Sequence, residues 1–328
     1  MPPRPAQRSA WEQMQAVLAA RRYYLDRATK SAISAELGIS RFKVARLLDE
    51  AVRQGIVTVE IHAPAEVDVD QSLRIVETFG IRRALVLRLP DGPETFRREQ
   101  LGRACAAVLA DLIDEGDVVG VAWGRTLHEM VRALPTLPTS TMVQIVGSVP
   151  TSDLRVNSLD LARSMAERAH GEVFALHVPM VVDSADTATR LRQDSHVSKT
   201  VAMFDHLTKA IVSIGAWQPD QSALMAALPG ALQQTLADAG AVADICATVM
   251  DLAGDKINAG DLQGRCMAIT SEQLRAVPTV IAIVGGPVRA TAIGAALRSG
   301  LVHCLITDDR TATELLARGH GAPSASAS

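Results

Sequence analysis

From about Gln71 onward, short runs of β-branched and other apolar residues alternate with amphipathic segments. The runs expected to form strands are Ala84–Leu89, Val118–Ala122, Met142–Val146, Val173–Val178, Ile211–Ile214, Asp244–Val249, Cys266–Ile269, Val280–Val284 and Cys304–Thr307. Helical periodicity separates many of them, at Leu101–Ile113, Ser158–Ala169, Val197–Thr208, Val288–Leu297 and Thr311–Leu316. Because nearly continuous apolar strands separated by helices must be covered on both faces, the pattern predicts a doubly wound, mostly parallel α/β sheet.

Residues 29–55 have a different pattern, that of a helix-turn-helix. Gly38 supplies the tight turn, because glycine adopts a positive φ without steric cost. Ser40 follows as the N-cap of the second helix. Apolar residues have the spacing that packs two short helices across this turn, namely Ile33, Leu37, Ile39, Val44 and Leu47.

The second helix of this motif carries polar and basic residues outward, as a recognition helix does when it enters the major groove of DNA. The candidate DNA-binding residues are Thr29, Ser40, Arg41, Phe42, Lys43 and Arg46. Thr29 and Ser40 are expected near phosphates, and Phe42 has a packing role as its alternative. The motif therefore predicts that double-stranded DNA is a partner.

The elements around the motif extend it to a small winged domain over residues 1–62. Residues 11–26 are expected to be a first helix, whose apolar stripe is Met14, Val17, Leu18, Tyr24 and Leu25. Gly55 ends the recognition helix, and residues 56–62 alternate like a strand, a candidate wing. Residues 63–70 are expected to be a linker, 71–320 the α/β domain and 321–328 a disordered tail.

Charge divides along the same boundary. The whole chain of 328 residues has a net charge of −3, but residues 1–62 contain 10 basic and 6 acidic residues. The remainder contains 23 basic and 30 acidic residues. A basic N-terminal domain on an acidic body suits a DNA-binding module joined to a domain with another task.

Other features of the sequence bound the functional class. No apolar run reaches the ~18 residues of a membrane span and no signal-peptide core follows the N-terminus, so a cytoplasmic protein is expected. The signatures of serine hydrolases, zinc proteases, Walker loops and dinucleotide-binding sites are missing from the sequence. The cysteines are expected to be buried reduced thiols, and they are Cys105, Cys246, Cys266 and Cys304. No metal or cofactor is expected.

Candidate ligand-binding residues follow several of the expected strands. In open α/β sheets, ligands bind at the carboxyl ends of strands. Gly124, Arg125 and Thr126 precede a helix whose N-terminus offers free N–H groups, which suits a phosphate or a polyol. The alternative is an ordinary strand-to-helix turn with a solvated arginine.

Three further segments are candidates at the same sheet edge. One strand ends after Gln144 in Gly147, and another ends in Gly285 and Gly286 before Arg289. Arg289 either reaches an anion or lies on the surface. Asp244, at a probable strand start, either hydrogen-bonds sugar hydroxyls or caps a turn.

The segments described above resemble the SorC-type family of sugar-responsive transcriptional regulators. The resemblance spans roughly residues 15–318 in one continuous order. In the head it rests on residues 23–48 and 55–59, and in the body on residues 117–127, 143–147, 285–286 and 306–308. Arg289 stands where the family often has lysine, which excludes lysine chemistry there, and Ser34 replaces a usual alanine.

The resemblance implies an effector domain similar to sugar-phosphate isomerase folds, assembled as a homo-oligomer, typically a tetramer. It places a sugar, polyol or sugar phosphate against Gly124, Arg125, Thr126, Gln144, Gly147, Asp244, Gly285, Gly286 and Arg289. The predicted function is an effector-controlled DNA-binding regulator of carbohydrate or polyol metabolism that binds an operator as a dimer or tetramer. The alternatives are a sugar-phosphate isomerase-like enzyme and a scaffold without a ligand.

Overall fold

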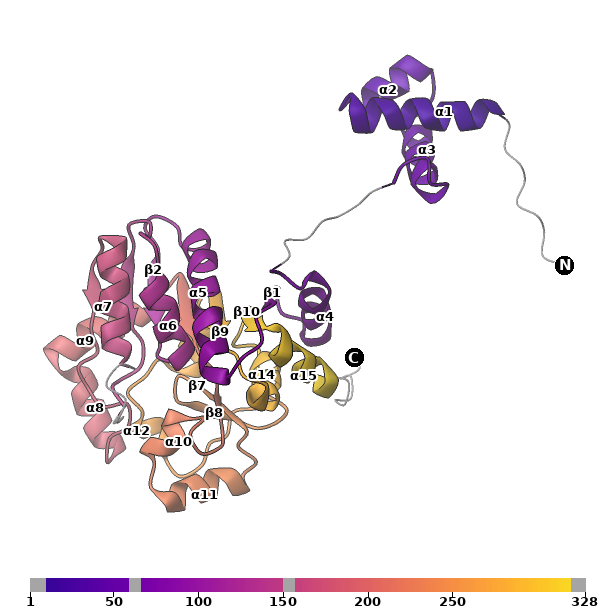
Figure 1. Ribbon diagram of the computed structural model, residues 1–328. Helices are drawn as coiled ribbons and strands as arrows, with labels where there is room; N and C mark the ends of the chain where they lie inside the picture. The colour runs from indigo at the N-terminus through magenta and orange to yellow at the C-terminus, as the bar shows by residue number, and fades with distance from the viewer. Residues whose placement is uncertain (1–9, 59–65, 150–156, 320–328) are drawn as a thin grey trace. The chain divides into compact units, whose positions relative to one another are not determined.

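The chain forms two compact units, residues 1–62 and 63–328, in the computed structural model (Figure 1). We call them the head and the body. The structure describes residues 10–58, 66–149 and 157–319.

The described part of the head is a helical unit built around the predicted helix-turn-helix. Its helices are α1 (Ala10–Ala20), α2 (Lys30–Leu37) and α3 (Arg41–Arg53), with a π-helical turn at Arg21–Leu25. Gly38, with a φ of 62°, ends α2 in the left-handed conformation, as predicted. Ile33, Leu37, Ile39, Val44 and Leu47 all join the head's core, so the predicted helix-turn-helix packing is confirmed.

The predicted apolar stripe of the first helix is wrong. Met14, Val17, Leu18, Tyr24 and Leu25 are all exposed, Leu25 to 74%. The core side of the helix is formed instead by small residues, Ala16, Ala19 and Ala20, which pack against α2 and α3 residues. Alanine lets two helix backbones approach closely, and α1 makes its main contacts with α3.

The predicted wing falls largely outside the described residues. Residues 56–58 follow α3 without forming a strand, and residues 59–62 are not described. Gly55 has the positive φ of 72° expected of a residue that ends a helix.

The body is built on a seven-stranded sheet whose neighbouring strands are all parallel. Its order is β1-β10-β9-β5-β2-β3-β4. The strands are β1 (Arg83–Leu87), β2 (Val118–Val121), β3 (Thr141–Gln144), β4 (Val173–Phe174), β5 (Lys209–Val212), β9 (Thr279–Ile283) and β10 (Cys304–Asp308). A small antiparallel sheet contains β6 (Gly215–Ala216), β7 (Ala243–Ile245) and β8 (Thr248–Met250).

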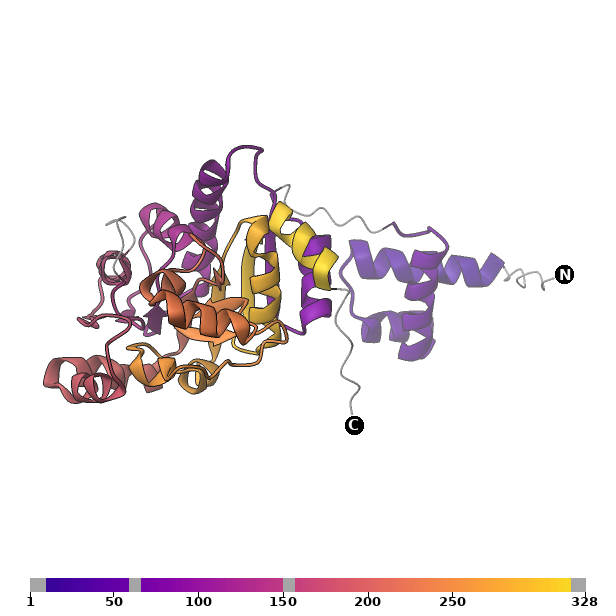
Figure 2. The ribbon, with the colours of Figure 1, turned by 90° about the horizontal axis from the view of Figure 1, so that it is seen from below.

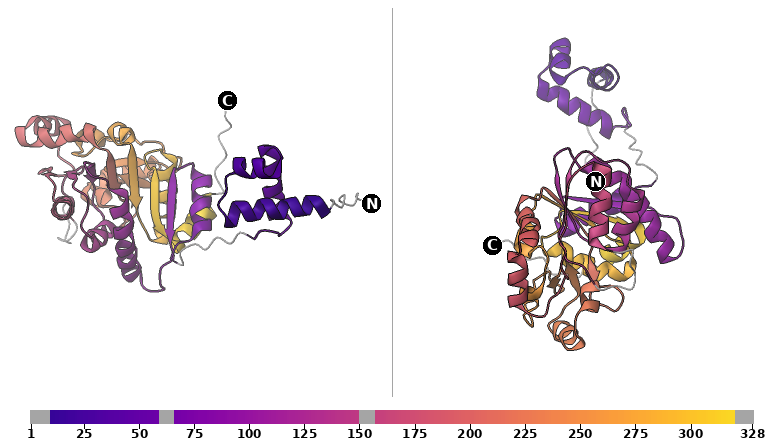
Figure 3. Two further views of the ribbon diagram at one scale, coloured as in Figure 1. Left: turned by 90° about the horizontal axis from the view of Figure 1, so that it is seen from above. Right: turned by 90° about the vertical axis from the view of Figure 1, so that its left-hand side faces the viewer.

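Helices cover both faces of the large sheet (Figures 1 and 3). The helices of the body include α4 (Val69–Phe79), α5 (Glu94–Leu112), α6 (Arg125–Ala133), α7 (Ser158–Ala169), α14 (Ala290–Arg298) and α15 (Asp309–Gly319). The others are α8 (Ala185–Gln193), α9 (Ser195–Ala202), α10 (Ala223–Ala227), α11 (Gly230–Asp238), α12 (Leu262–Arg265) and α13 (Ser271–Ala276), with 3₁₀ turns at Met203–His206 and Pro287–Arg289. Figure 2 shows α4 beside α15, two helices that contact each other.

Strand β9 shows why the sheet needs both layers. Ile281 and Ile283 pack into the core beneath α5, α6 and α7, whereas Val280 and Ala282 pack into the core beneath α14 and α15. Alternate side chains of a strand point to opposite faces, so an apolar run such as this is buried only between two layers of helices. The predicted doubly wound, mostly parallel α/β sheet is confirmed.

Three expected strands differ from the structure. Of the run expected over residues 173–178, only Val173–Phe174 forms a strand, β4. Residues 244–249 form not one strand but β7 and β8, joined by a turn in which Cys246 and Ala247 have φ values of 48° and 65°. The Cys266–Ile269 run makes only isolated bridges, at Cys266 and Ala268. Short apolar runs satisfy several backbone pairings equally, so the neighbouring chain decides between them.

The segment predicted to be a linker ends within the body. Val67 pairs with Leu87 of β1, and Asp68 caps α4 by accepting a hydrogen bond from the Gln71 backbone N–H at 3.0 Å. Residues 63–65 of that segment and the predicted tail at 321–328 lie outside the described residues.

Candidate functional site

A cavity of about 410 Å³ lies at the carboxyl ends of β2, β5 and β9. Strand β2 pairs on one side with β3, the next strand of this sheet along the chain, and on its other side with β5. The order in which the strands are added to the sheet therefore reverses direction at β2. Ligands of open parallel sheets bind at such a reversal. The cavity is lined by Ala122, Trp123, Gly124, Arg125, Thr126, Val146, Met180, Ser213, Ile214, Gly215, Asp220, Gln221, Ser222, Ala223, Ala226, Asp244, Cys246, Ala247 and Arg289.

The loop after β2 brings a helix N-terminus to the cavity. Gly124 precedes α6, and Arg125 and Thr126 are its first residues. A Cβ at Gly124 would lie 2.7 Å from the Ser213 Cβ, so only glycine lets this loop approach the loop that follows β5. The first-turn N–H groups of an α-helix have no intrahelical acceptor, which makes this end of the cavity suitable for an anion.

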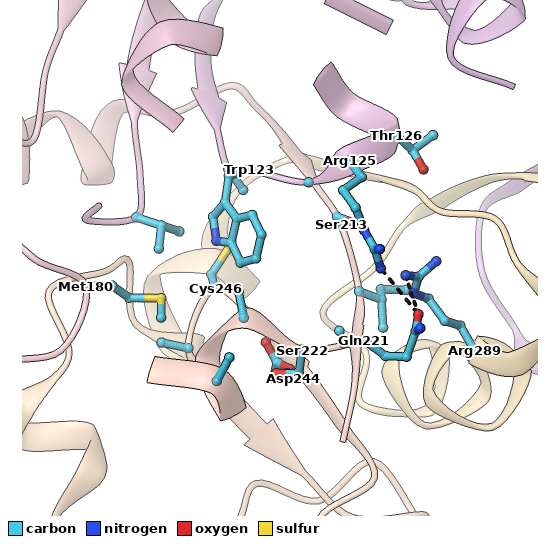
Figure 4. A pocket seen from close by; sticks show the side chains of 18 of the residues that line it. Trp123, Arg125, Thr126, Met180, Ser213, Gln221, Ser222, Asp244, Cys246 and Arg289 are labelled. Carbon is cyan, nitrogen blue, oxygen red and sulfur yellow. Dashed lines mark hydrogen bonds between the residues drawn. The ribbon is translucent and has the colours of Figure 1, made fainter. Parts of the chain in front are cut away.

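Two arginines converge on one neutral side chain (Figure 4). The Arg289 guanidinium donates to the Gln221 Oε1 at 2.5 Å and to the Gly285 carbonyl at 2.7 Å. The Arg125 guanidinium donates to the same Gln221 oxygen at 3.4 Å and to the Asp220 carbonyl at 2.9 Å. The acceptors of these four hydrogen bonds are thus uncharged oxygens, although both donors are cations.

The electrostatics of Arg289 favour an added negative charge. Its side chain is only 6% exposed, and within the described residues no carboxylate forms an ion pair with it. Burial, reinforced by the positive charge of Arg125, lowers the pKa of Arg289 to about 10. An anion bound between Arg125 and Arg289 would stabilise the charged form of Arg289 through charge-assisted hydrogen bonds. It would also offset the repulsion between the two guanidinium groups.

Asp244 supplies a hydrogen-bond acceptor elsewhere on the cavity wall. It lies on β7 opposite Gly215, where an added Cβ would lie 2.2 Å from the Asp244 Oδ2. Ser222 Oγ donates to that oxygen at 2.6 Å. Burial raises the pKa of Asp244 to about 6, although the Ser222 hydrogen bond acts in the opposite direction. At neutral pH the carboxylate is therefore mostly ionised and suited to accept a hydroxyl hydrogen bond.

The rest of the wall is less polar. Trp123, Met180 and Cys246 lie away from the arginines in the view of Figure 4. Burial raises the pKa of the Cys246 thiol, so this cysteine stays protonated and acts as an apolar wall.

The structure brings together five of the nine predicted effector residues, Gly124, Arg125, Thr126, Asp244 and Arg289. Gln144 and Gly147 are not among the residues that line this cavity. Gln144 is fully buried, and its side chain donates to Ser158 Oγ and accepts from the Leu176 N–H, each at 2.8 Å. A Cβ at Gly147 would lie 2.7 Å from the Pro179 carbonyl oxygen, so this glycine serves chain packing.

Gly285 and Gly286 line a neighbouring cavity of about 120 Å³ beside Arg97 and Asp308. The Gly286 N–H donates to Thr311 Oγ1 at 2.8 Å, and Gly285 holds Arg289 through its carbonyl. These two glycines therefore position the arginine rather than line the larger cavity.

Sequence reasoning missed the residues that close the cavity from the opposite side. Gln221 and Ser222 lie in the loop between β6 and α10, and Cys246 and Ala247 form the β7–β8 turn. Paired positive φ values in a two-residue hairpin usually require glycine or asparagine, and neither is present. No local signal marks these residues.

In the head, the recognition helix α3 presents the predicted basic residues to solvent. Arg41, Lys43 and Arg46 are exposed, while Val44 and Leu47 of the same helix are buried. Phe42 is 86% exposed, so it does not pack into the core formed by the described residues of the head. Its exposure leaves it available for an interaction outside the head.

The predicted phosphate-contacting residues are the caps of the motif's helices. Thr29 Oγ1 accepts from the Ala32 N–H, and Ser40 Oγ accepts from the Lys43 N–H, both at 3.2 Å. These caps fix the two helix N-termini at the surface that carries the basic side chains.

The described residues offer neither a metal site nor a membrane-spanning helix. They contain no group of three or more histidine, cysteine or acidic side chains arranged to hold a metal ion. Across the same part of the chain, every helix is too short or too polar to cross a membrane.

Known proteins are similar to this chain in both sequence and fold. Residues 63–317 match the family described as "Putative sugar-binding domain". The Escherichia coli (strain K12) protein named "Uncharacterized transcriptional regulator YjhU" is 31% identical over 306 residues, which are 90% of this chain and 92% of that protein. The transcriptional regulator LsrR of Enterobacter sp. (strain 638) is 27% identical over 90% of each chain.

Among solved structures, the full-length sorbitol operon regulator SorC from Klebsiella pneumoniae is similar over head and body together. It has a TM-score of 0.70 and 26% sequence identity, and the match covers 94% of this chain and all of that one. These relatives are regulators and not enzymes, which overturns the isomerase alternative. Agreement along nearly the whole length shows that this chain belongs to the SorC-type family of sugar-binding transcriptional regulators, whose members control DNA binding through an effector.

Proposed function

We propose that the effector of this regulator is a phosphorylated sugar or polyol that binds in the 410 Å³ cavity of the body. The observation that carries the proposal is the pair of guanidinium groups, Arg125 and Arg289, that meet on the uncharged Gln221 side chain. A phosphate there would accept from both arginines and from the first N–H groups of α6.

The remaining contacts suit a sugar. Asp244 would accept a hydrogen bond from an effector hydroxyl, while Gly124 and Thr126 line the loop that faces the phosphate. The Klebsiella pneumoniae relative is named a sorbitol operon regulator, and sorbitol is a polyol. A polyol or sugar carbon chain is therefore the class that fits between the anion site and Asp244.

On the DNA side, we propose that Arg41, Lys43 and Arg46 contact the operator, with Thr29 and Ser40 near its phosphates. Phe42, which the first turn of α3 exposes to solvent, would make an apolar contact with the DNA. Such contacts by one small head cover few base pairs, so high specificity needs several heads on repeated half-sites.

A homodimer or homotetramer is accordingly part of the proposal. The apolar side chains that α1 leaves exposed support it, since Trp11 is 68% and Met14 53% exposed. Large apolar side chains gathered on one exposed helix face are common at protein interfaces. Sedimentation velocity of the full chain should give a mass of two or four subunits, and a monomer at micromolar concentration contradicts this part. The protein would work in the cytoplasm, where the DNA is.

The test of the effector site is a mobility-shift titration with the DNA upstream of the protein's own gene. Sugars, polyols and their phosphates are added to the wild type and to the double variant Thr126→Ala, Arg289→Ala. The variant should bind DNA as the wild type does and should no longer respond to the active compound. Retained DNA binding is also the control that the variant folds.

Two outcomes contradict the proposal. If no compound changes the wild-type band, the cavity does not sense this ligand class. If the double variant responds like the wild type, the effector binds elsewhere in the protein.

A further inference from the structure

Gln221 occupies the position that an anionic group of the effector would take. Its Oε1 accepts from Arg289 at 2.5 Å and from Arg125 at 3.4 Å, and the neighbouring Asp220 carbonyl accepts from Arg125 at 2.9 Å. The amide oxygen and the backbone carbonyl together act as a neutral substitute for a bidentate anion.

Gln221 belongs to a tight turn at residues 216–222, which is closed by backbone hydrogen bonds. The Ala216 N–H donates to the Gln221 carbonyl at 3.2 Å, and the Gln221 N–H donates to the Gln218 carbonyl at 3.1 Å. Asp220 has a φ of 60°, a left-handed conformation that costs a non-glycine residue about 1 kcal/mol. The arginine hydrogen bonds therefore help to hold a turn that is locally unfavourable.

The same turn also contacts the part of the cavity wall that contains Asp244. Ser222, the next residue, donates to Asp244 at 2.6 Å and caps α10 by accepting from the Met225 N–H at 3.0 Å. A displacement of Gln221 would therefore be passed to the partner of Asp244 and to the start of α10.

We propose that Gln221 is a latch that competes with the effector's anionic group for Arg125 and Arg289. Binding of a phosphate displaces the Gln221 side chain and releases the turn at residues 216–222, which transmits cavity occupancy to β6 and α10. The inference rests on the proposed function, because it requires an anionic effector at these two arginines.

The formal charge of a phosphate favours it over the Gln221 amide in the competition for the two arginines. A phosphate oxygen carries formal charge and makes stronger hydrogen bonds to a guanidinium than an amide oxygen does. The latch nevertheless weakens the apparent affinity, because the cavity is competent only in the fraction of molecules whose latch is open. Removing the latch side chain should therefore tighten anion binding, which is the reverse of what a direct effector ligand would show.

The first measurement is isothermal titration of the full chain with inorganic phosphate. Gln221→Ala should bind phosphate more tightly than the wild type, on the order of tenfold for the loss of hydrogen bonds to a charged group. Gln221→Glu places a carboxylate between the arginines and should weaken phosphate binding at least about tenfold. Gln218→Ala, an exposed residue of the same turn that is outside the cavity lining, is the matched control and should bind like the wild type.

The second measurement is hydrogen exchange of the backbone amides at residues 216–222. Phosphate should speed exchange in the wild type, because the turn is released, whereas an ordinary bound ligand slows exchange. Gln221→Ala should exchange quickly with or without phosphate.

The outcomes separate the latch from the effector site. If Arg125→Ala abolishes phosphate binding but Gln221→Ala binds no more tightly than the wild type, the latch is wrong and the anion site stands. If Arg125→Ala binds phosphate as the wild type does, the anion site itself is wrong, and the latch is overturned with it. Slower exchange of the turn with phosphate also overturns the latch.

Discussion

Asp244 shows how the surroundings of one side chain set its chemistry. The carboxyl is buried against Gly215 and accepts a hydrogen bond from Ser222. Burial raises its pKa from 3.8 to about 6, because the charged form loses its hydration. The residue thus sits near the point at which it gains or loses its charge under mildly acidic conditions.

This pKa predicts a dependence of stability on pH. The folded protein holds the Asp244 proton more tightly than the unfolded chain does, so this contribution to stability is full below about pH 4 and is lost as the pH rises through about 6. The change corresponds to on the order of 3 kcal/mol. Relative to the wild type, Asp244→Asn should therefore gain stability by that amount between pH 4 and pH 7, as measured by urea unfolding.

The exposed Asp238 offers a control, because Asp238→Asn keeps Asp244 in place and should follow the wild-type pH profile. Taking the difference between proteins cancels the contributions of other titrating groups. Parallel pH profiles for wild type and Asp244→Asn would show that the carboxyl is not raised in pKa.

At the scale of the element, α3 combines a buried face with a basic exposed face in 13 residues. Val44, Leu47 and Ala51 pack into the head's core, so the helix cannot rotate to hide Arg46. Substituting an exposed arginine therefore changes the surface of the head without disturbing its core.

Single substitutions Arg41→Ala, Lys43→Ala and Arg46→Ala should each weaken operator binding and reduce its salt dependence. Each lost phosphate contact reduces the slope of log affinity against log salt by about 0.9. Arg53→Ala is the control, since Arg53 lies in the last turn of the same helix and pairs with Glu50. An equal loss of affinity in Arg53→Ala would mean that net charge, rather than this helix face, drives binding.

At the scale of the whole molecule, head and body have separate hydrophobic cores. The head's core contains residues from α1, α2 and α3, whereas the two cores of the body lie on opposite faces of the large sheet. Each unit can therefore lose its structure without exposing the core of the other.

Calorimetry of the full chain should accordingly show two unfolding transitions, and the effector should raise only the body's. A ligand at 100 times its Kd adds about 2.7 kcal/mol. For a unit of this size that corresponds to roughly 5–10 °C. Arg289→Ala should lose the shift while the head's transition is unchanged. A single transition, or an equal shift of both, contradicts the independence of the units.

Local patterns predicted much of this architecture. The helix Ser158–Ala169 has the bounds expected, and β2, β9 and β10 lie within about a residue of their predicted positions. Hydrophobic periodicity depends only on residues close in sequence, so it predicts helices and strands without knowledge of the fold. The stripe of α1 failed because its alanines pack closely in the head's core, and no local pattern shows which face of a helix a neighbour will cover.

The sequence by itself determined the class of the sheet, the helix-turn-helix and the arginine-bearing loops after β2 and β9. Only the tertiary structure decided which strand ends meet. That arrangement buried Gln144 in the core, made the Gly285 carbonyl an acceptor for Arg289, and placed Gln221 between two arginines. The physical reason is that the order of strands depends on pairing and burial shared by distant residues, such as Lys209 with Thr279 and Arg83 with Cys304. A local pattern carries no record of such distant partners.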